Sequence, residues 1–355
     1  MKTLMTYYKY STLTAILALV VAGFIGYSSG NMAATVLSVA VLCILEISLS
    51  FDNAVVNAKK LKDMDKYWRD WFIKWGILIA VFGMRLVIPV LIVSILGGIS
   101  PWGAAYMAID SPKEYAHVLE ESHYIISAFG GSFLFMVALE FFLDHDKDNH
   151  WIHHVENPLA FIGRGGLVTD VLVTGAVIIG ISFYIENTHQ ISYIISGAVG
   201  IGLFLAIHFL KEFLENMDSD DGNKVNMAGS VAKNGLAGVI YLEVLDASMS
   251  FDGVIGAFAI STNIFIVLLG LGVGAFFVRS ITIHMVEKET LGEFRYLEHG
   301  AFWAILFLSM IMLFGPVMHI SEVITGCIGA TFITAAIIHS HRLNKLDKKL
   351  ETQND

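Results

Sequence analysis

The stretch LEISLSFDN at residues 45–53 returns in altered form as LDASMSFDG at residues 245–253. When the two copies are aligned on their shared Ser-Phe-Asp, each acid of the first copy meets an acid of the second. The matched acids are Glu46 with Asp246 and Asp52 with Asp252. A carboxylate at membrane depth is costly and normally faces a cavity or a partner on an ion or proton path. A duplicated one therefore predicts a membrane transporter built from two related halves.

The composition supports a membrane protein. Hydrophobic residues make up 55% of the chain and charged residues only 15%, whereas soluble domains carry roughly 25% charged residues. Apolar stretches of the roughly 17–25 residues that cross a bilayer occur at ten places. They cover 11–28, 33–57, 72–97, 123–143, 166–185, 191–210, 234–260, 263–286, 299–314 and 317–340. We therefore expect an all-α polytopic membrane protein with about ten transmembrane helices, forming a single transport domain over residues 1–355.

Basic residues indicate the orientation. Nearly all lysines and arginines outside the predicted spans fall in alternate connections and at the two ends, and the opposite connections hold one, Lys113. Because basic loops stay in the cytoplasm, both termini are predicted to be cytoplasmic, in a bacterial inner membrane. Residues 11–27 could instead be a secretory signal peptide. Their apolar stretch is long and no small-x-small cleavage site follows, which favours a membrane anchor.

The two motifs predict an inverted repeat. They lie in the second and seventh predicted spans, and this odd separation makes the two spans cross the membrane in opposite directions. The first repeat covers about 33–143 and the second about 229–314. Each motif span is followed by a span with a lone arginine, Arg85 or Arg279. Such arginines are expected to pair with the repeat carboxylates, although each could instead extend to a membrane interface.

Helical spacing groups the polar residues of each motif. At roughly 100° per residue, each copy forms one polar stripe. The stripes are Glu46, Ser50, Asn53 and Asn57 in the first copy, and Glu243, Asp246, Ser250 and Gly253 in the second. Asp52 and Asp252 fall off these stripes. Either the two helices are wetted on both sides, or each unwinds near Ser-Phe-Asp and frees carbonyls that can coordinate a cation.

The ligand chemistry points to a hard cation. Carboxylate and amide oxygens suit Mn²⁺, Ca²⁺ or Mg²⁺. The predicted metal ligands are Glu46, Asp52, Asn53, Glu243, Asp246 and Asp252, supported by Arg85, Arg279, Ser50 and Ser250. These acids outnumber the arginines, so a divalent cation or protons would neutralise the excess. The acids could merely link helices, but serine and asparagine would do so at about 0.6–2 kcal/mol per contact, without the cost of burying carboxylates.

Two weaker groups of polar residues stand apart from the motifs. Histidines crowd one cytoplasmic connection, at His145, His150, His153 and His154. They could bind a metal as a sensor, but their spacing matches no familiar site and a solvated loop is favoured. Glu140, Asp170 and His208 lie in or near predicted spans. Each could be a proton relay or a counter-charge, or simply a contact between helices.

At the two motifs the chain resembles the TerC family of integral membrane proteins, in the lysine-exporter-like superfamily. Glu46 followed by Leu49 to Ala54 is similar to the family's first motif, and residues 243–257 are similar to its second. The resemblance implies metal-ion handling, best described for Mn²⁺ efflux. The chain departs from the family at Asp252-Gly253-Val254-Ile255, where the family has Asp-Ser-x-Pro. The serine ligand and the proline kink are therefore missing here.

These observations predict a secondary transporter that exports a divalent cation, Mn²⁺ foremost with Ca²⁺ as the alternative, coupled to protons and without a prosthetic group. No Gly-x-x-x-x-Gly-Lys-Ser/Thr occurs, which disfavours ATP, and a net charge of −10 argues against nucleic acid. An enzyme is not expected, because the Gly-x-Gly-Asp and Tyr-Asp motifs of an intramembrane aspartyl protease are missing around Asp52 and Asp252. A non-transporting scaffold or sensor of a metal- or tellurite-stress response stays open, as does the oligomeric state.

Overall fold

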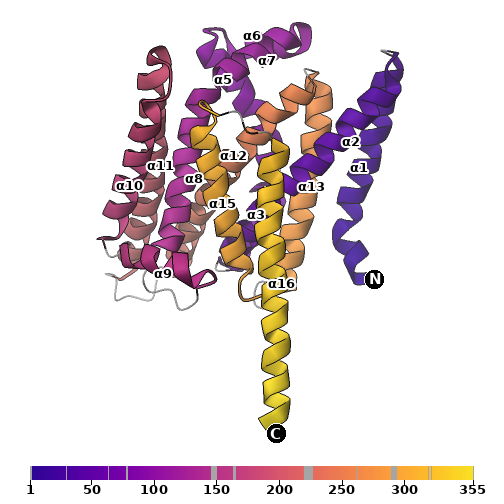
Figure 1. The fold of residues 1–355 in the computed structure, drawn as a ribbon. Coiled ribbons are helices and arrows are strands. Elements are labelled where there is room, and N and C mark those ends of the chain that lie inside the picture. The colour runs from indigo at the N-terminus through magenta and orange to yellow at the C-terminus, as the bar shows by residue number, and fades with distance from the viewer. Residues whose placement is uncertain are drawn as a thin grey trace.

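The computed structural model describes residues 2–28, 30–62, 64–76, 79–144, 150–162, 165–219, 227–261, 263–288, 294–318, 320 and 322–354. Over these residues the regular elements are helices, without a strand (Figure 1). The first half contains α1 (Lys2–Ser28), α2 (Met32–Leu49), α3 (Phe51–Lys62), α4 (Lys66–Trp71), the π-helical segments η1 (Phe72–Gly76) and η2 (Ile79–Val87), α5 (Ile88–Leu96), α6 (Pro101–Asp110), α7 (Pro112–Glu121), α8 (His123–Phe142) and α9 (His153–Ile162). The second half contains α10 (Leu167–Ser182), α11 (Asn187–Ser219), α12 (Met227–Ile260), α13 (Ile264–Glu287), α15 (Leu297–Phe314) and α16 (Glu322–Asn354). The all-α prediction is confirmed.

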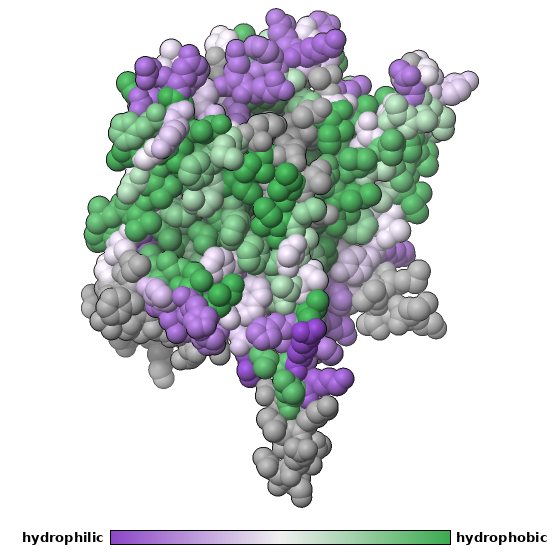
Figure 2. Space-filling view, in the orientation of Figure 1, coloured by the Kyte–Doolittle hydropathy of each residue, from purple (hydrophilic) through white to green (hydrophobic). Residues whose placement is uncertain are grey.

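The molecule has the surface of a multi-pass membrane protein. Among the described residues, six helices are long and apolar enough to cross a bilayer: Thr6–Ser28, His123–Phe142, Asn187–Leu210, Ile264–Glu287, Leu297–Phe314 and Ile324–Leu346. A seventh crossing results if the bent pair Met32–Ile47 and Phe51–Lys62 is one span. Hydrophobic residues form a band across the middle of the visible face, with hydrophilic residues toward both ends (Figure 2). Both chain ends lie toward the lower end in Figure 1, and α6 and α7 cover the upper one.

Three of the ten predicted spans take other forms. The stretch predicted at 72–97 is divided among η1, η2 and α5. The stretch at 166–185 is a helix of 16 residues, α10. The stretch at 234–260 lies in α12, which is 34 residues long but carries three acids that lower its hydropathy. The count of ten spans stays a prediction.

The two motif copies differ in backbone conformation. In the first copy the helix bends by 43° between α2 and α3, at Ser50, whose φ is −99° and ψ 12°. In the second copy α12 runs as one helix through Ser250 and Asp252. The local unwinding considered for both copies is therefore limited to a bend in the first. A proline would remove a backbone donor and kink the helix, and the second copy has Ile255 at the position where the TerC motif has one.

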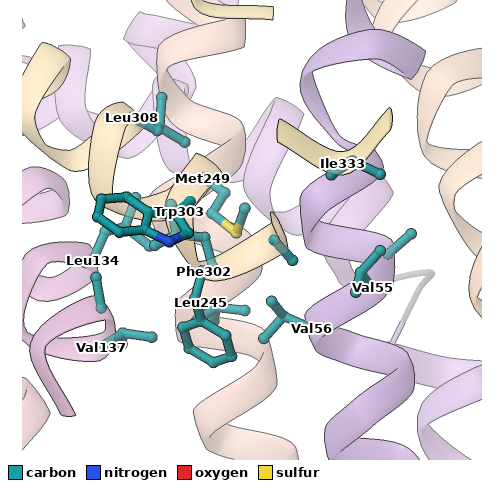
Figure 3. Close-up of a cluster of buried hydrophobic side chains, with 14 of the residues drawn as sticks. Val55, Val56, Leu134, Val137, Leu245, Met249, Phe302, Trp303, Leu308 and Ile333 are labelled. Atoms are coloured by element: carbon teal, nitrogen blue, oxygen red, sulfur yellow. The ribbon is translucent and has the colours of Figure 1, made fainter. Parts of the chain in front are cut away.

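The centre of the bundle is a packed apolar core. The cluster joins α3, α8, α12 and α15, and Figure 3 shows Val56, Leu134, Leu245 and Phe302 converging in it. Leu134 and Leu245 are fully buried. Because lipid tails are as apolar as leucine, close van der Waals packing is what holds such side chains together in a membrane bundle. The core thereby holds the second motif helix, α12, against α3 of the first.

Candidate functional site

A buried ion pair lies where α2 ends. The Arg85 guanidinium of η2 contacts Glu46 Oε1, and both side chains are 2% exposed. Ser50 Oγ also donates to Glu46 Oε1, at 3.1 Å. The π-helical segment presents Arg85 from the neighbouring span, and π-helical turns are frequent at functional sites. Because a buried charge without a partner is strongly destabilising, Arg85 and Glu46 depend on one another.

A second contact connects the two motif copies. Asn53 Nδ2 of α3 donates to Asp246 Oδ1 of α12, and the two side chains are 0% and 5% exposed. Asp246 also lies within electrostatic range of Arg85. Four helical elements, α2, α3, η2 and α12, thus bring two carboxylates, one amide and one guanidinium together. We call Glu46, Ser50, Asn53, Arg85 and Asp246 the central site.

Glycines allow α13 to approach this site closely. A Cβ atom built on Gly274 would lie 2.0 Å from Cγ of Glu46, and one on Gly270 would lie 2.3 Å from Cβ of Leu42. The glycines are four residues apart, as are their neighbours on α2. This is the small-xxx-small spacing that lets membrane helices pack at close range. Gly270 and Gly274 were missed as site residues, although their spacing in an apolar span was the available signal.

A small cavity adjoins the central site. Its volume is about 20 Å³, room for about one water-sized particle. It is lined by Asn57, Phe72, Arg85, Asp246, Ala275, Val278, Arg279 and Thr282. Buried polar atoms on its lining residues, among them Asn57 Oδ1, Asp246 Oδ2 and Arg279 Nε, have no hydrogen-bond partner in the described part of the chain. The lone arginines of both predicted repeats thus border the same cavity.

Two acids of α12 are incompletely satisfied. Asp246 Oδ2 and both carboxylate oxygens of Glu243 are buried without a hydrogen-bond partner among the described residues. Glu243 lies against η1, where a Cβ on Gly76 would be 2.6 Å from its Oε1 atom. An unsatisfied buried acceptor costs about 1–3 kcal/mol and a charged one more. These oxygens are where a cation or a proton would be most stabilising.

The other predicted ligands have different surroundings. Asp52 is 4% exposed and accepts a hydrogen bond from the backbone N–H of Asn53 at 2.9 Å. Ser250 is buried on α12, and its Oγ has no partner within the described chain. The backbone of Asp252 belongs to α12, but its side chain lies outside the described residues. The structure therefore brings five of the ten predicted residues together directly, and Arg279 joins them at the cavity.

One of the two carboxylates of the central site, Glu46, is neutralised by an internal cation, Arg85. Among the side chains that the structure describes, no group of three or more His, Cys, Asp or Glu residues is placed to hold a metal ion. Glu46 is turned toward Arg85, and Asp246 toward Asn53. An incoming cation would find an oxygen-rich site, and it would have to displace the guanidinium to be held by both carboxylates.

The histidine-rich connection forms a different kind of site. Residues 145–149 lie outside the described residues, whereas His150 is 3.5 Å from the fully buried carboxylate of Glu156. That carboxylate also contacts Trp303 Nε1 at 3.0 Å and His299 Nδ1 at 3.1 Å, and accepts the Trp151 N–H at 3.0 Å. Burial opposes ionisation, but these hydrogen bonds outweigh it and lower the pKa of Glu156 to about 2. Glu156 thus anchors α9 to α15; His299 and Trp303 carried no sequence signal for this role.

A family model described as "Protein of unknown function (DUF475)" matches residues 51–347. The match contains α3, α12 and α13, and therefore most of the central site, but begins after Glu46 and Ser50. No curated protein matches the chain, and no solved structure does. The family description names no substrate and no relation to TerC, so the function has to be argued from the site itself.

Proposed function

We propose that this chain, which belongs to the DUF475 family, is a secondary transporter that exports a divalent cation across the membrane, Mn²⁺ foremost. The observation that carries the proposal is the set of buried, unsatisfied carboxylate oxygens on α12, at Glu243 and Asp246. Ionisable groups within a membrane bundle are costly and mark ion or proton paths. A purely structural role would favour complete hydrogen bonding.

Arg85 limits the net negative charge of the site when it is empty. Its guanidinium is paired with Glu46 and lies within range of Asp246. A divalent cation bound by these carboxylates, with Asn53 and Ser50 as further oxygen donors, would take over that neutralising role. Arg85 would then turn toward the adjoining cavity. The loaded and the empty site would then both carry little net charge within the apolar bundle.

The arrangement of the motif helices supports alternating access. The α1–α2 turn and the α12–α13 turn lie at the same end of the bundle in Figure 1. The chain therefore runs away from that end along α2 and toward it along α12. Opposite directions of the two motif helices are what an inverted repeat requires, and inverted-repeat transporters bind their ion at the interface of the repeats. In this proposal Asn53 and Asp246 form that interface.

The test is cation flux in proteoliposomes that contain the purified protein. Mn²⁺, Ca²⁺, Mg²⁺ and Zn²⁺ are compared under proton gradients of both signs, in the wild type and in Glu46→Gln and Asp246→Asn. Glu120→Gln, an exposed acid on α7, is the matched control. We expect saturable flux of one cation, Mn²⁺ foremost, kept in the control and reduced at least about tenfold, or 1.4 kcal/mol, in the site variants.

Two outcomes of the flux measurement would contradict the proposal. If the wild type moves none of the four cations under either gradient, the transporter proposal is overturned and the scaffold or sensor hypothesis takes its place. Flux that persists unchanged in Glu46→Gln and Asp246→Asn would place the ion path elsewhere in the molecule.

A further inference from the structure

A second group of titratable side chains lies apart from the central site, where α8, α10 and α11 pack together. His208 Nδ1 of α11 is 3.4 Å from Glu140 Oε1 of α8. Asp170, in the first turn of α10, lies within electrostatic range of both. The three residues are far apart in sequence, and each belongs to a different helix. We call Glu140, Asp170 and His208 the peripheral cluster.

Asp170 is the unusual member of this cluster. It is 4% exposed, and its Oδ1 atom has no hydrogen-bond partner within the described chain. The hydroxyl of Thr174, one turn along the same helix, donates from Oγ1 to the backbone carbonyl of Asp170 at 2.8 Å rather than to the carboxylate. A buried, unsatisfied carboxylate oxygen beside a second carboxylate is a place where a proton relieves both the lost hydration and the repulsion between charges.

The other two members give the buried acid a connection to the outside. The side chains of Glu140 and His208 are 45% and 35% exposed. With a neutral imidazole, the two carboxylates give the cluster a charge of −2. An imidazole in contact with one carboxylate can pass a proton between solvent and the buried acid, because its ring nitrogens can both accept and donate a proton.

Charged and titratable groups on the neighbouring helices have contacts of their own. From α12, Tyr241 lies within electrostatic range of Glu140, and the ammonium of Lys60 lies over the Tyr241 ring, 5.5 Å from its centroid. From α15, His299 is bound to Glu156, and Glu298 is paired with Lys59 of α3. In the part of the chain that the structure describes, no three ligands here are arranged for a metal. The ligand that fits the cluster is a proton.

We propose that Asp170, Glu140 and His208 form a reversible proton-binding site that couples proton movement to the central site through α12. The link is Tyr241, which lies near Glu140 and is two residues from Glu243 on the same helix. Because α12 packs against α8, a change of charge at Glu140 acts directly on the helix that carries Asp246. The coupling role rests on the proposed transport function, whereas proton binding by the cluster does not.

Two measurements separate these claims. The first is infrared difference spectroscopy of the purified protein in lipid during a pH titration, which detects carboxyl protonation without any transport. We expect one carboxyl band of the wild type to disappear in Asp170→Asn and to shift its midpoint in His208→Gln. Glu120→Gln, exposed on α7, should leave that band in place. A spectrum unchanged in Asp170→Asn would overturn the proton site.

The second measurement compares coupled flux with exchange in proteoliposomes. In Asp170→Asn we expect the proton movement that accompanies cation flux to fall about tenfold, within the usual range of coupling between two sites. Exchange of labelled for unlabelled cation at equal pH should persist, because the central site is intact. Undiminished proton movement in Asp170→Asn would overturn the coupling role. Absence of all cation flux in the wild type would overturn the proposed function, and the infrared result would still decide proton binding.

Discussion

Two kinds of buried carboxylate can be compared among the described residues: one whose oxygens are hydrogen-bonded and one whose oxygens lack partners. Glu156 is surrounded by donors from α9 and α15, and its hydrogen bonds overcome the cost of burial. Glu243 and Asp246 on α12 keep oxygen atoms without a partner. A fully satisfied buried network rigidifies a fold, whereas a partly satisfied one costs stability. The difference supports the proposal that the acids of α12 serve transport rather than folding.

The largest effect on stability is expected at Glu156. In Glu156→Ala, the Trp303 and His299 side chains lose their shared acceptor, and α9 loses its anchor on α15. We expect the free energy of unfolding to fall by about 3 kcal/mol, measured by denaturation in detergent micelles. Cation affinity of the remaining folded protein should not change. A variant as stable as the wild type would remove Glu156 from the structural side of the comparison.

The next effect is expected where α13 approaches the central site. Gly274→Leu places side-chain atoms in the volume that Glu46 occupies, since even a Cβ would lie 2.0 Å from Glu46 Cγ. We expect a loss of about 2 kcal/mol in the free energy of unfolding together with loss of flux. Gly272→Leu is the matched control, because nothing lies within 4 Å of a Cβ at that position. Equal stability of both variants would contradict the close packing of α13 on Glu46.

A smaller effect of opposite sign is expected at Asp246. Asp246→Asn removes a buried charge whose Oδ2 atom has no donor, and its amide can still accept from Asn53. We expect the free energy of unfolding to rise by about 1 kcal/mol while flux is lost. The same denaturation and flux measurements apply. Lower stability in this variant would show that Asp246 serves the fold, and the contrast with Glu156 would disappear.

A further effect is expected from pH alone. The pKa of Glu156 is lowered from 4.5 to about 2, so its ionised form stabilises the folded state above pH 4.5. That contribution is lost as the pH falls from 4.5 through about 2. A protonated Glu156 still fills its place, so the loss should be no larger than in the alanine variant. The free energy of unfolding of the wild type should fall over this pH interval more steeply than that of Glu156→Gln. Parallel stability curves for the two proteins would contradict the lowered pKa of Glu156.

Local sequence could predict several parts of the central site. Glu46, Asp246 and Arg85 stand out because each is a charge in an apolar stretch, and such a charge needs a partner wherever the chain places it. The Glu156 network could not be found in this way. Its members, Trp151, Glu156, His299 and Trp303, lie in two segments about 140 residues apart, and none of them breaks an apolar pattern. Only the packing of α9 on α15 brings them together.

The backbone conformation of the two motifs also could not be predicted from the local sequence. Spacing on an ideal helix suggested that both copies would unwind or be wetted on two sides. The structure bends the first copy at Ser50 and continues the second as α12. The helical hydrogen bonding continues up to the bend, since the Ser50 N–H donates to the Glu46 carbonyl at 3.0 Å. The Ser-Phe-Asp that the copies share does not decide between these outcomes, because it is the same in both.

The sequence by itself determined the helical class, the membrane setting and the identity of the exceptional acids, because length, hydropathy and isolated charge are properties of single segments. The tertiary structure alone decided that Arg85 pairs with Glu46, that Asn53 bonds to Asp246, and that Glu243 is left unsatisfied. These choices depend on which helices pack side by side. An ion pair or hydrogen bond is decided at distances of about 3 Å, and only the folded bundle sets such distances between residues that are 39 or 193 positions apart.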